Sequence, residues 1–140
     1  MCIGNEDGGD DAVGPFVAKE LKKSGFENTI DCGTTPENYT SVIKKKKPEK
    51  LIIVDAIDMG LKSGEIRIVP KEKIGVMTIS THGIPVSVLI GYLGQYVDDI
   101  ILIGIQPKTM NGDMTNSAIQ SAKKLVKIIK DDDFKIIEKL

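Results

Sequence analysis

The chain has no tryptophan, only one histidine, and an aromatic content of 4%. Neither sign of charge dominates, since the formal net charge at pH 7 is −1, and basic and aromatic residues are not interleaved. These features argue against a nucleic-acid-binding protein. No apolar stretch approaches the roughly 18 residues that span a bilayer, and no signal peptide is visible. We therefore expect a cytoplasmic protein that binds neither nucleic acid nor membrane.

Cysteine is also scarce. Cys2 and Cys32 cannot form a disulfide framework in a reducing compartment, and both fall in expected strands, so we predict two buried free thiols. The basic run at 44–47 follows an expected helix and is interpreted as a solvated helix end. With 140 residues the chain is long enough for one substantial core, and we predict a single domain over 1–140.

Apolar runs and helical periodicity alternate along the chain. The pattern predicts strands at 1–4, 29–32, 51–55, 65–69 and 99–105, and helices at 12–24, 36–45, 85–96 and 116–130. Such alternation predicts an α/β fold, a three-layer α/β/α sandwich around a mostly parallel sheet. About ten residues separate the strand at 65–69 from the preceding one, fewer than a parallel crossover needs, so we expect it to run antiparallel. In the helix at 85–96 we expect Val88, Leu89, Tyr92 and Leu93 to point inward.

The histidine, His82, is the first candidate for chemistry, with Asp11 and Asp55 as partners. Ligands of such sheets bind at the carboxyl ends of strands, where the winding order reverses. If the first and third strands are neighbours, Asp11 follows one, Asp55 ends the other, and both carboxylates face one crevice. Two carboxylates and an imidazole suit a borderline divalent metal such as nickel, zinc or iron. The alternatives are purely structural: Asp10 or Asp11 caps the helix, Asp55 closes a turn, and His82 binds backbone.

Other sites fit the sequence less well. The glycine-rich stretch 4–14 precedes a helix, as phosphate cradles do, but it lacks the nucleotide-binding patterns and carries four acidic residues. The stretch 31–35 contains one turn similar to those of pepsin-like proteases, which need two such turns. No Gly-x-Ser-x-Gly elbow is present for a serine nucleophile.

Five segments together resemble the [NiFe]-hydrogenase maturation endopeptidases, in the branch that processes hydrogenase 3. They are Gly4-Asn5-Glu6-Asp7-Gly8-Gly9-Asp10-Asp11-Ala12-Val13-Gly14-Pro15, Asp31-Cys32-Gly33-Thr34-Thr35-Pro36-Glu37-Asn38, Val54-Asp55-Ala56-Ile57-Asp58-Met59-Gly60-Leu61, Thr81-His82-Gly83-Ile84-Pro85 and Gly104-Ile105-Gln106-Pro107. Each motif alone is weak. Their order and spacing over nearly the whole chain make the resemblance specific.

The resemblance implies a phosphorylase/hydrolase-like fold, with a five-stranded mixed sheet between helices and one antiparallel strand. It implies that Asp11, Asp55 and His82 are both the catalytic residues and the metal-binding trio, and that Asn5, Gly33 and Thr34 contact the substrate. The implied enzyme is a peptidase, aspartic-type by family assignment, that removes the C-terminal extension of a hydrogenase large-subunit precursor after nickel insertion. The nickel is recognised in the substrate, and zinc or cadmium can take its place in crystals.

Several points stay open at the level of sequence. A non-cleaving nickel sensor or chaperone would use the same trio, and a hydrolase with another substrate is a third possibility. Nickel either polarises the scissile bond or only positions it, with Asp11 or Asp55 as general base. We expect a monomer. The resemblance implies that the first strand is central in the sheet, but only Met1-Cys2-Ile3 represent it. A strand this short would leave backbone groups of its neighbours unpaired. Either the native N-terminus lies upstream, or the sheet forms with a short first strand.

Overall fold

The computed structural model describes residues 1–77 and 83–140. Its elements in chain order are β1 (Cys2–Ile3), η1 (Gly9–Ala12), α1 (Val13–Lys23), β2 (Asp31–Gly33), η2 (Pro36–Tyr39), α2 (Thr40–Lys46), β3 (Lys50–Ala56), β4 (Ile66–Val69), α3 (Lys71–Ile74), α4 (Val86–Leu93), β5 (Asp99–Ile105), α5 (Asn116–Asp131) and η3 (Phe134–Ile136). No helix among these described residues is long and apolar enough to cross a membrane.

The strands form one five-stranded sheet in the order β2-β1-β3-β5-β4. β1 pairs in parallel with both β2 and β3, β3 pairs in parallel with β5, and β4 runs antiparallel to β5. The predicted mixed, mostly parallel sheet is therefore confirmed, as is the antiparallel direction of the strand after Asp55. The first and third strands are neighbours, which is the condition that the two-carboxylate crevice requires.

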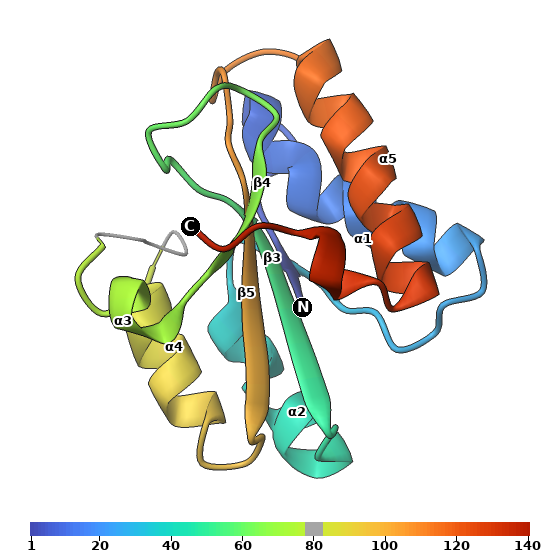
Figure 1. The fold of residues 1–140 in the computed structure, drawn as a ribbon. Coiled ribbons are helices and arrows are strands. Elements are labelled where there is room, and N and C mark those ends of the chain that lie inside the picture. The colour runs from blue at the N-terminus through green and yellow to red at the C-terminus, as the bar shows by residue number, and fades with distance from the viewer. Residues whose placement is uncertain (78–82) are drawn as a thin grey trace.

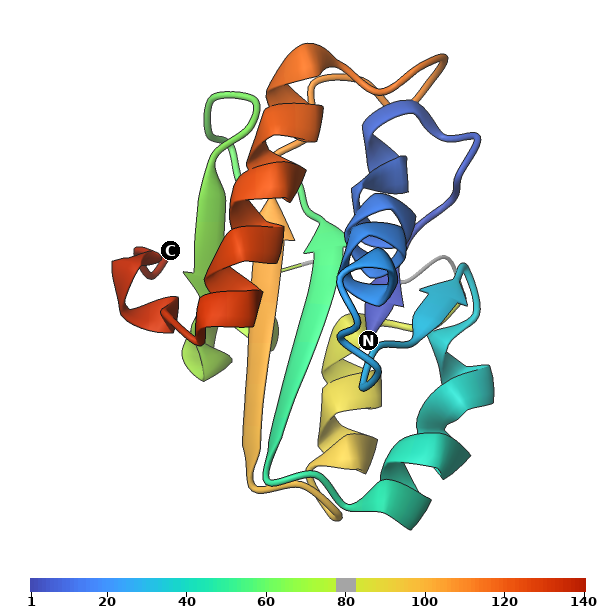
Figure 2. The ribbon, with the colours of Figure 1, turned by 90° about the vertical axis from the view of Figure 1, so that its right-hand side faces the viewer.

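Helices cover both faces of the sheet (Figures 1 and 2). α1 and α5 pack on one face, where Val13, Val17 and Leu125 are fully buried in one apolar cluster. α2 and α4 cover the other face with a second cluster that includes Leu89 and Leu93. Because β3 is buried by both layers, its apolar residues run without alternation. The expected three-layer arrangement follows from this burial.

The inward face of α4 was only half predicted. Leu89 and Leu93 are buried, but Val88 is 58% exposed and Tyr92 is 39% exposed. Residues 86, 89 and 93 define the buried stripe at helical spacing, and positions 88 and 92 lie one turn apart outside it. The helix carries no charged residue to mark its outer side, so its sequence pattern does not distinguish the two faces.

Cysteine and lysine behave as expected. Cys2 and Cys32 are free and buried, and burial raises the pKa of the Cys32 thiol to about 12. The lysines at 44–46 end α2 and are exposed, as a solvated helix end should be. The second strand was predicted at 29–32, whereas β2 begins at Asp31 and ends at Gly33.

The end of the chain covers the edge strand of the sheet, which the sequence pattern did not indicate. The Ile68 amide of β4 donates to the Glu138 carbonyl at 3.0 Å, and the Leu140 amide donates back to the Ile68 carbonyl at 2.9 Å. This short parallel pairing protects the open edge of β4 from pairing with another chain.

α1 packs directly on β1 because Gly14 has no side chain. A Cβ on Gly14 would overlap the carbonyl oxygen of Ile3, whereas a Cβ on Gly91 of α4 would meet nothing. We expect Gly14→Ala to lower the free energy of unfolding by about 3 kcal/mol, because backbone must shift to admit the methyl group. Urea denaturation followed by circular dichroism measures this change.

Gly91→Ala is the matched control, since it makes the same substitution in a helix at an open position. It should raise the free energy of unfolding by about 0.5–1 kcal/mol through the lower entropy of the unfolded chain. Equal effects of the two substitutions would contradict the close contact between α1 and β1.

Candidate active site

Asp55 and Asp11 meet at the carboxyl ends of β1 and β3. Asp55 is the penultimate residue of β3, opposite Gly104 of β5, and only 1% of it is exposed. Asp11 lies in η1, which follows β1 after a short loop and contacts β3, and only 3% of it is exposed. The negative charge of Asp11 acts on Asp55, so the topology brings the two predicted carboxylates together.

Asp55 is the unusual group of the pair. Neither of its carboxyl oxygens has a hydrogen-bond partner among the described residues, although both are buried. Burial, and after it the charge of Asp11, raises the pKa of Asp55 well above its ordinary value. The Ala56 amide opposes this change, but its effect is smaller than that of burial or of Asp11. Within residues 1–77 and 83–140, Asp55 is thus a desolvated carboxyl group without the hydrogen bonds that a structural aspartate usually makes.

Asp11 is held by the loop that precedes it. The Asn5 amide donates to Asp11 Oδ2 at 3.0 Å, and the Asn5 side chain accepts the Asp7 amide at 2.9 Å. Gly4 has φ +153°, and a Cβ there would overlap the carbonyl oxygen of Asp11. The loop can therefore fold back on itself only with glycine at position 4. This explains how Asn5, itself exposed, forms the border of the site beside Asp11.

Gly33 and Thr34 lie next to this border. The Gly4 amide donates to the Gly33 carbonyl at 2.9 Å, which joins the end of β2 to the start of the Asn5 loop. Gly33 has φ +54° and ends β2, and Thr34 is half-buried in the turn that follows. Asn5, Gly33 and Thr34 thus all lie at the carboxyl ends of β1 and β2, the end of the sheet at which Asp11 lies. His82, the third predicted ligand, lies outside the described residues.

Asp10 does not cap the helix, and neither does Asp11, so that structural alternative is wrong. α1 and η1 begin without any side-chain cap. Asp10 instead accepts the amides of Lys108 at 2.8 Å and Thr115 at 2.7 Å, and the Thr115 hydroxyl. Burial raises the pKa of Asp10, but these hydrogen bonds more than compensate and lower it below the ordinary value. Asp10 anchors the site loop to the start of α5 across 105 residues of sequence.

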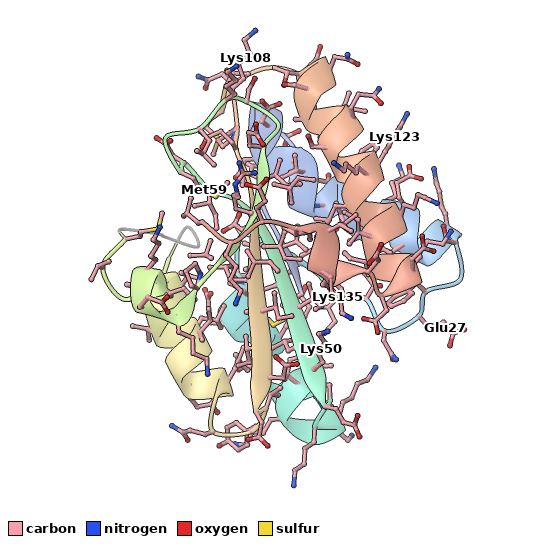
Figure 3. The ribbon with its side chains drawn as sticks, in the orientation of Figure 1. Glu27, Lys50, Met59, Lys108, Lys123 and Lys135 are labelled. Atoms are coloured by element: carbon pink, nitrogen blue, oxygen red, sulfur yellow. The ribbon has the colours of Figure 1, made fainter. Side chains whose placement is uncertain are left out.

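Gln106 is a site-forming residue to which the sequence analysis assigns no role, although one of the five segments contains it. Its side chain is buried and its Oε1 accepts the amides of Met59 at 2.7 Å and Leu61 at 3.2 Å, while its Nε2 donates to Asp58 Oδ1 at 3.1 Å. These bonds fix the loop that follows Asp55, and Figure 3 shows Met59 beside the carboxyl end of β3. A glutamine directly after a buried strand, where ligands bind, was the available signal.

Glu37 is a second residue that was not singled out. Its Oε2 is buried without a hydrogen-bond partner in the described part of the chain, and its Oε1 would lie 3.5 Å from a Cβ on Gly83. It therefore borders the segment that follows His82. The described residues contain no group of three histidine, cysteine, aspartate or glutamate side chains that would hold a metal. Asp11 and Asp55 alone form a two-carboxylate site, which is incomplete as a metal centre without a further ligand.

Comparison with known proteins gives one consistent family. The profile of the family described as "Hydrogenase maturation protease" matches residues 15–132. The hydrogenase 3 maturation protease of Escherichia coli strain K12 is 41% identical over 110 residues, which cover 76% of this chain and 70% of that protein.

Solved structures agree with the sequence comparisons. The crystal structure of a hydrogenase 3 maturation protease superposes with a TM-score of 0.90 at 32% identity, covering 99% of this chain and 93% of that one. The [NiFe] hydrogenase maturation protease HycI from Thermococcus kodakarensis KOD1 gives a TM-score of 0.82 at 33% identity, covering 93% and 87%. The chain belongs to the hydrogenase maturation protease family and is thus a hydrolase of the endopeptidase kind. The profile includes Asp55 and begins after Asp11.

Asp55 should reduce stability at neutral pH. Because its pKa is raised on folding, the native state binds more protons than the unfolded state above about pH 4, and stability falls as pH rises toward the folded pKa. We expect Asp55→Asn to raise the free energy of unfolding at pH 7 by at least about 1 kcal/mol. The gain should disappear near pH 4, and denaturant titrations at both pH values measure it.

Asp10→Asn is the contrasting control, because the pKa of Asp10 is lowered on folding and its stabilisation is present above the unfolded pKa. Asp10→Asn should lower the free energy of unfolding at pH 7 by about 1–3 kcal/mol, because the asparagine amide cannot accept all the hydrogen bonds that the carboxylate accepts. Asp55→Asn behaving like Asp10→Asn would show that Asp55 is an ordinary structural carboxylate.

Proposed function

We propose that the protein is a maturation endopeptidase that removes the C-terminal extension of a [NiFe]-hydrogenase large-subunit precursor once nickel has been inserted. The observation that carries the proposal is the buried Asp55 carboxyl, whose two oxygens have no described partner, beside Asp11. Family membership supplies the reaction class, and the curated relative is a hydrogenase 3 maturation protease. The substrate and its nickel are inferences from these two supports together.

The electrostatics of the pair favour recognition of a cation. Burial and the charge of Asp11 raise the pKa of Asp55, so they favour its protonated form while the site has no cation. A divalent ion that arrives with the precursor would stabilise both carboxylates and release that proton. His82 is the third ligand in this proposal, and a neutral imidazole suits nickel well. The site thereby distinguishes a nickel-loaded precursor from an empty one.

The peptide bond must then be cleaved by water. Two roles for the carboxylates fit the site: the nickel polarises the scissile carbonyl while both carboxylates bind it, or one carboxylate acts as general base. Under either role the border residues Asn5, Gly33 and Thr34 hold the extended C-terminal segment next to Asp11. We propose that nickel is part of the substrate, that the enzyme is of the aspartic type, and that it acts as a cytoplasmic monomer.

The experiment is a processing assay on a large-subunit precursor, prepared with and without nickel and followed by intact mass. We expect loss of the C-terminal peptide from the nickel-loaded form only. Cleavage of both forms would refute nickel recognition. Binding of the nickel-loaded precursor without any change in its mass would refute the endopeptidase and favour the non-cleaving nickel sensor.

Three variants connect the assay to the site. Asp11→Asn, Asp55→Asn and His82→Ala should each reduce processing by at least about 100-fold, because each removes a ligand or base. Asp99→Asn is the control, because Asp99 is an exposed carboxylate at the amino end of β5, whereas the site lies at the carboxyl ends of the parallel strands. If one of these three variants processed the precursor at the wild-type rate, the substituted residue would have no role in the reaction.

A further inference from the structure

The loop that leaves β3 after Asp55 folds over the end of β5. Asp55 lies opposite Gly104 in the parallel pairing of β3 with β5. The Ile57 amide donates to the Ile105 carbonyl at 3.1 Å, which turns the chain toward β5. A Cβ on Gly104 would lie only 3.0 Å from Met59 Sδ. Because neighbouring strands are about 4.8 Å apart, the Met59 thioether lies beside Asp55, on the side of β5.

Met59 and the Asp55 carboxyl share one face of the sheet. Ile53 and Leu102 belong to the apolar cluster that α2 and α4 cover, and side chains two residues apart in a strand point the same way. Asp55 and Gly104 therefore face this layer too. Met59 packs against the same cluster and is half-buried. An apolar side chain thus lies next to an aspartate of which only 1% is exposed.

Gln106 holds this loop in place at several points. Its side-chain Oε1 accepts the amides of Met59 and Leu61. Its own amide donates to the Glu65 carbonyl at 2.9 Å, and its carbonyl accepts the Gly64 amide at 2.9 Å. One buried residue therefore holds both the middle and the far end of the loop. The bond to the Met59 amide, at 2.7 Å, determines where the Met59 side chain begins.

The two sides of Asp55 differ in their chemistry. The strand order is β2-β1-β3-β5-β4, so the border formed by Asn5, Gly33 and Thr34 lies on the β1 side of Asp55. Met59 lies on the β5 side. A peptide that reaches Asp55 therefore passes between a polar border and an apolar one.

We propose that Met59 is the wall that excludes water from Asp55 on the β5 side, and that Gln106 is the positioning residue that holds this wall. This role rests on the proposed function, because it requires that Asp55 takes part in the reaction. A wall that excludes water strengthens the electrostatic interactions of the carboxyl groups with the groups that they bind. Methionine suits the position, since its unbranched side chain adapts to a peptide that enters beside it.

A purely structural role of Gln106 has different consequences. If Gln106 only closed the loop, its loss would lower stability and leave the rate of processing unchanged in the folded protein. If Gln106 acts through Met59, the two residues are coupled in the reaction. A double-mutant cycle measures this coupling.

The test uses the full chain with Gln106→Met, with Met59→Ala, with both substitutions, and with Gln120→Met as the control. Gln106→Met keeps the approximate volume of the side chain and removes its hydrogen bonds. Gln120 is an exposed glutamine of α5. We expect NMR hydrogen exchange of the Met59 and Leu61 amides to be at least about 10-fold faster in Gln106→Met than in the control. Circular dichroism establishes that each variant is folded.

Kinetics on the nickel-loaded large-subunit precursor test the wall itself. We expect kcat to fall at least about 10-fold in Gln106→Met and in Met59→Ala, because both disturb the arrangement around Asp55. KM should change less than about 3-fold, since the groups that bind the nickel remain. The double variant should be no slower than the slower single variant, and Gln120→Met should process the precursor at the unmodified rate.

Gly104→Ala displaces the wall by a second route. Its Cβ would lie 3.0 Å from Met59 Sδ, and the hydrogen bonds of Gln106 are unaffected. This variant should lower kcat as Met59→Ala does. Unchanged kcat in both variants would refute the wall, even if Gln106→Met did not fold.

Two further outcomes would overturn the proposal. A double variant whose loss of kcat equals the product of the two single losses would show that Gln106 does not act through Met59. An unmodified chain that does not process the precursor would refute the proposed function and this role with it. Normal processing by the unmodified chain and by the Met59 and Gly104 variants would refute the wall alone and leave the proposed function intact.

Discussion

The burial of the Asp55 carboxyl beside Asp11 is the constraint on which the candidate active site depends. An aspartate with both oxygens buried and without described partners lowers stability unless it stays protonated or meets a cation. Asp10 and Gln106 do not carry this cost, because both make several hydrogen bonds. Among the described residues, Asp55 and Glu37 Oε2 are thus the buried acidic groups without hydrogen bonds, and Asp10 and Gln106 form a hydrogen-bonded frame around them, as active sites commonly show.

The frame depends on close approaches that only glycine allows. Gly14 lets α1 contact the backbone of β1, and Gly4 lets the following loop fold back over the carbonyl of Asp11. These contacts place η1 against β3, so that Asp11 reaches Asp55. From the far side, Asp10 ties the same loop to the residues that begin α5. A change at any of these positions would move Asp11 relative to Asp55 without touching either carboxylate.

The fold was largely predictable because it rests on local periodicity. The strand at 99–105 was predicted with the bounds that β5 has, and the antiparallel strand followed from the short connection after Asp55. The pairing of Asp11 with Asp55 followed from topology alone. The hydrogen bonds of Asp10 and Gln106 to these loops were not predictable, because their partners lie 45 to 105 residues away in sequence. The outward face of α4 was missed because it carries no charge.

The central claim is that burial, and after it the charge of Asp11, raises the pKa of the Asp55 carboxyl. The most direct measurement is a carboxyl ¹³C NMR titration of Asp55 in the unmodified chain and in the Asp11→Asn variant. The account predicts that Asp55 titrates well above the ordinary aspartate range, and that its pKa falls when the charge of Asp11 is removed. Titration of Asp55 near pH 4 in both proteins would contradict this claim, because it would show that neither burial nor Asp11 raises its pKa.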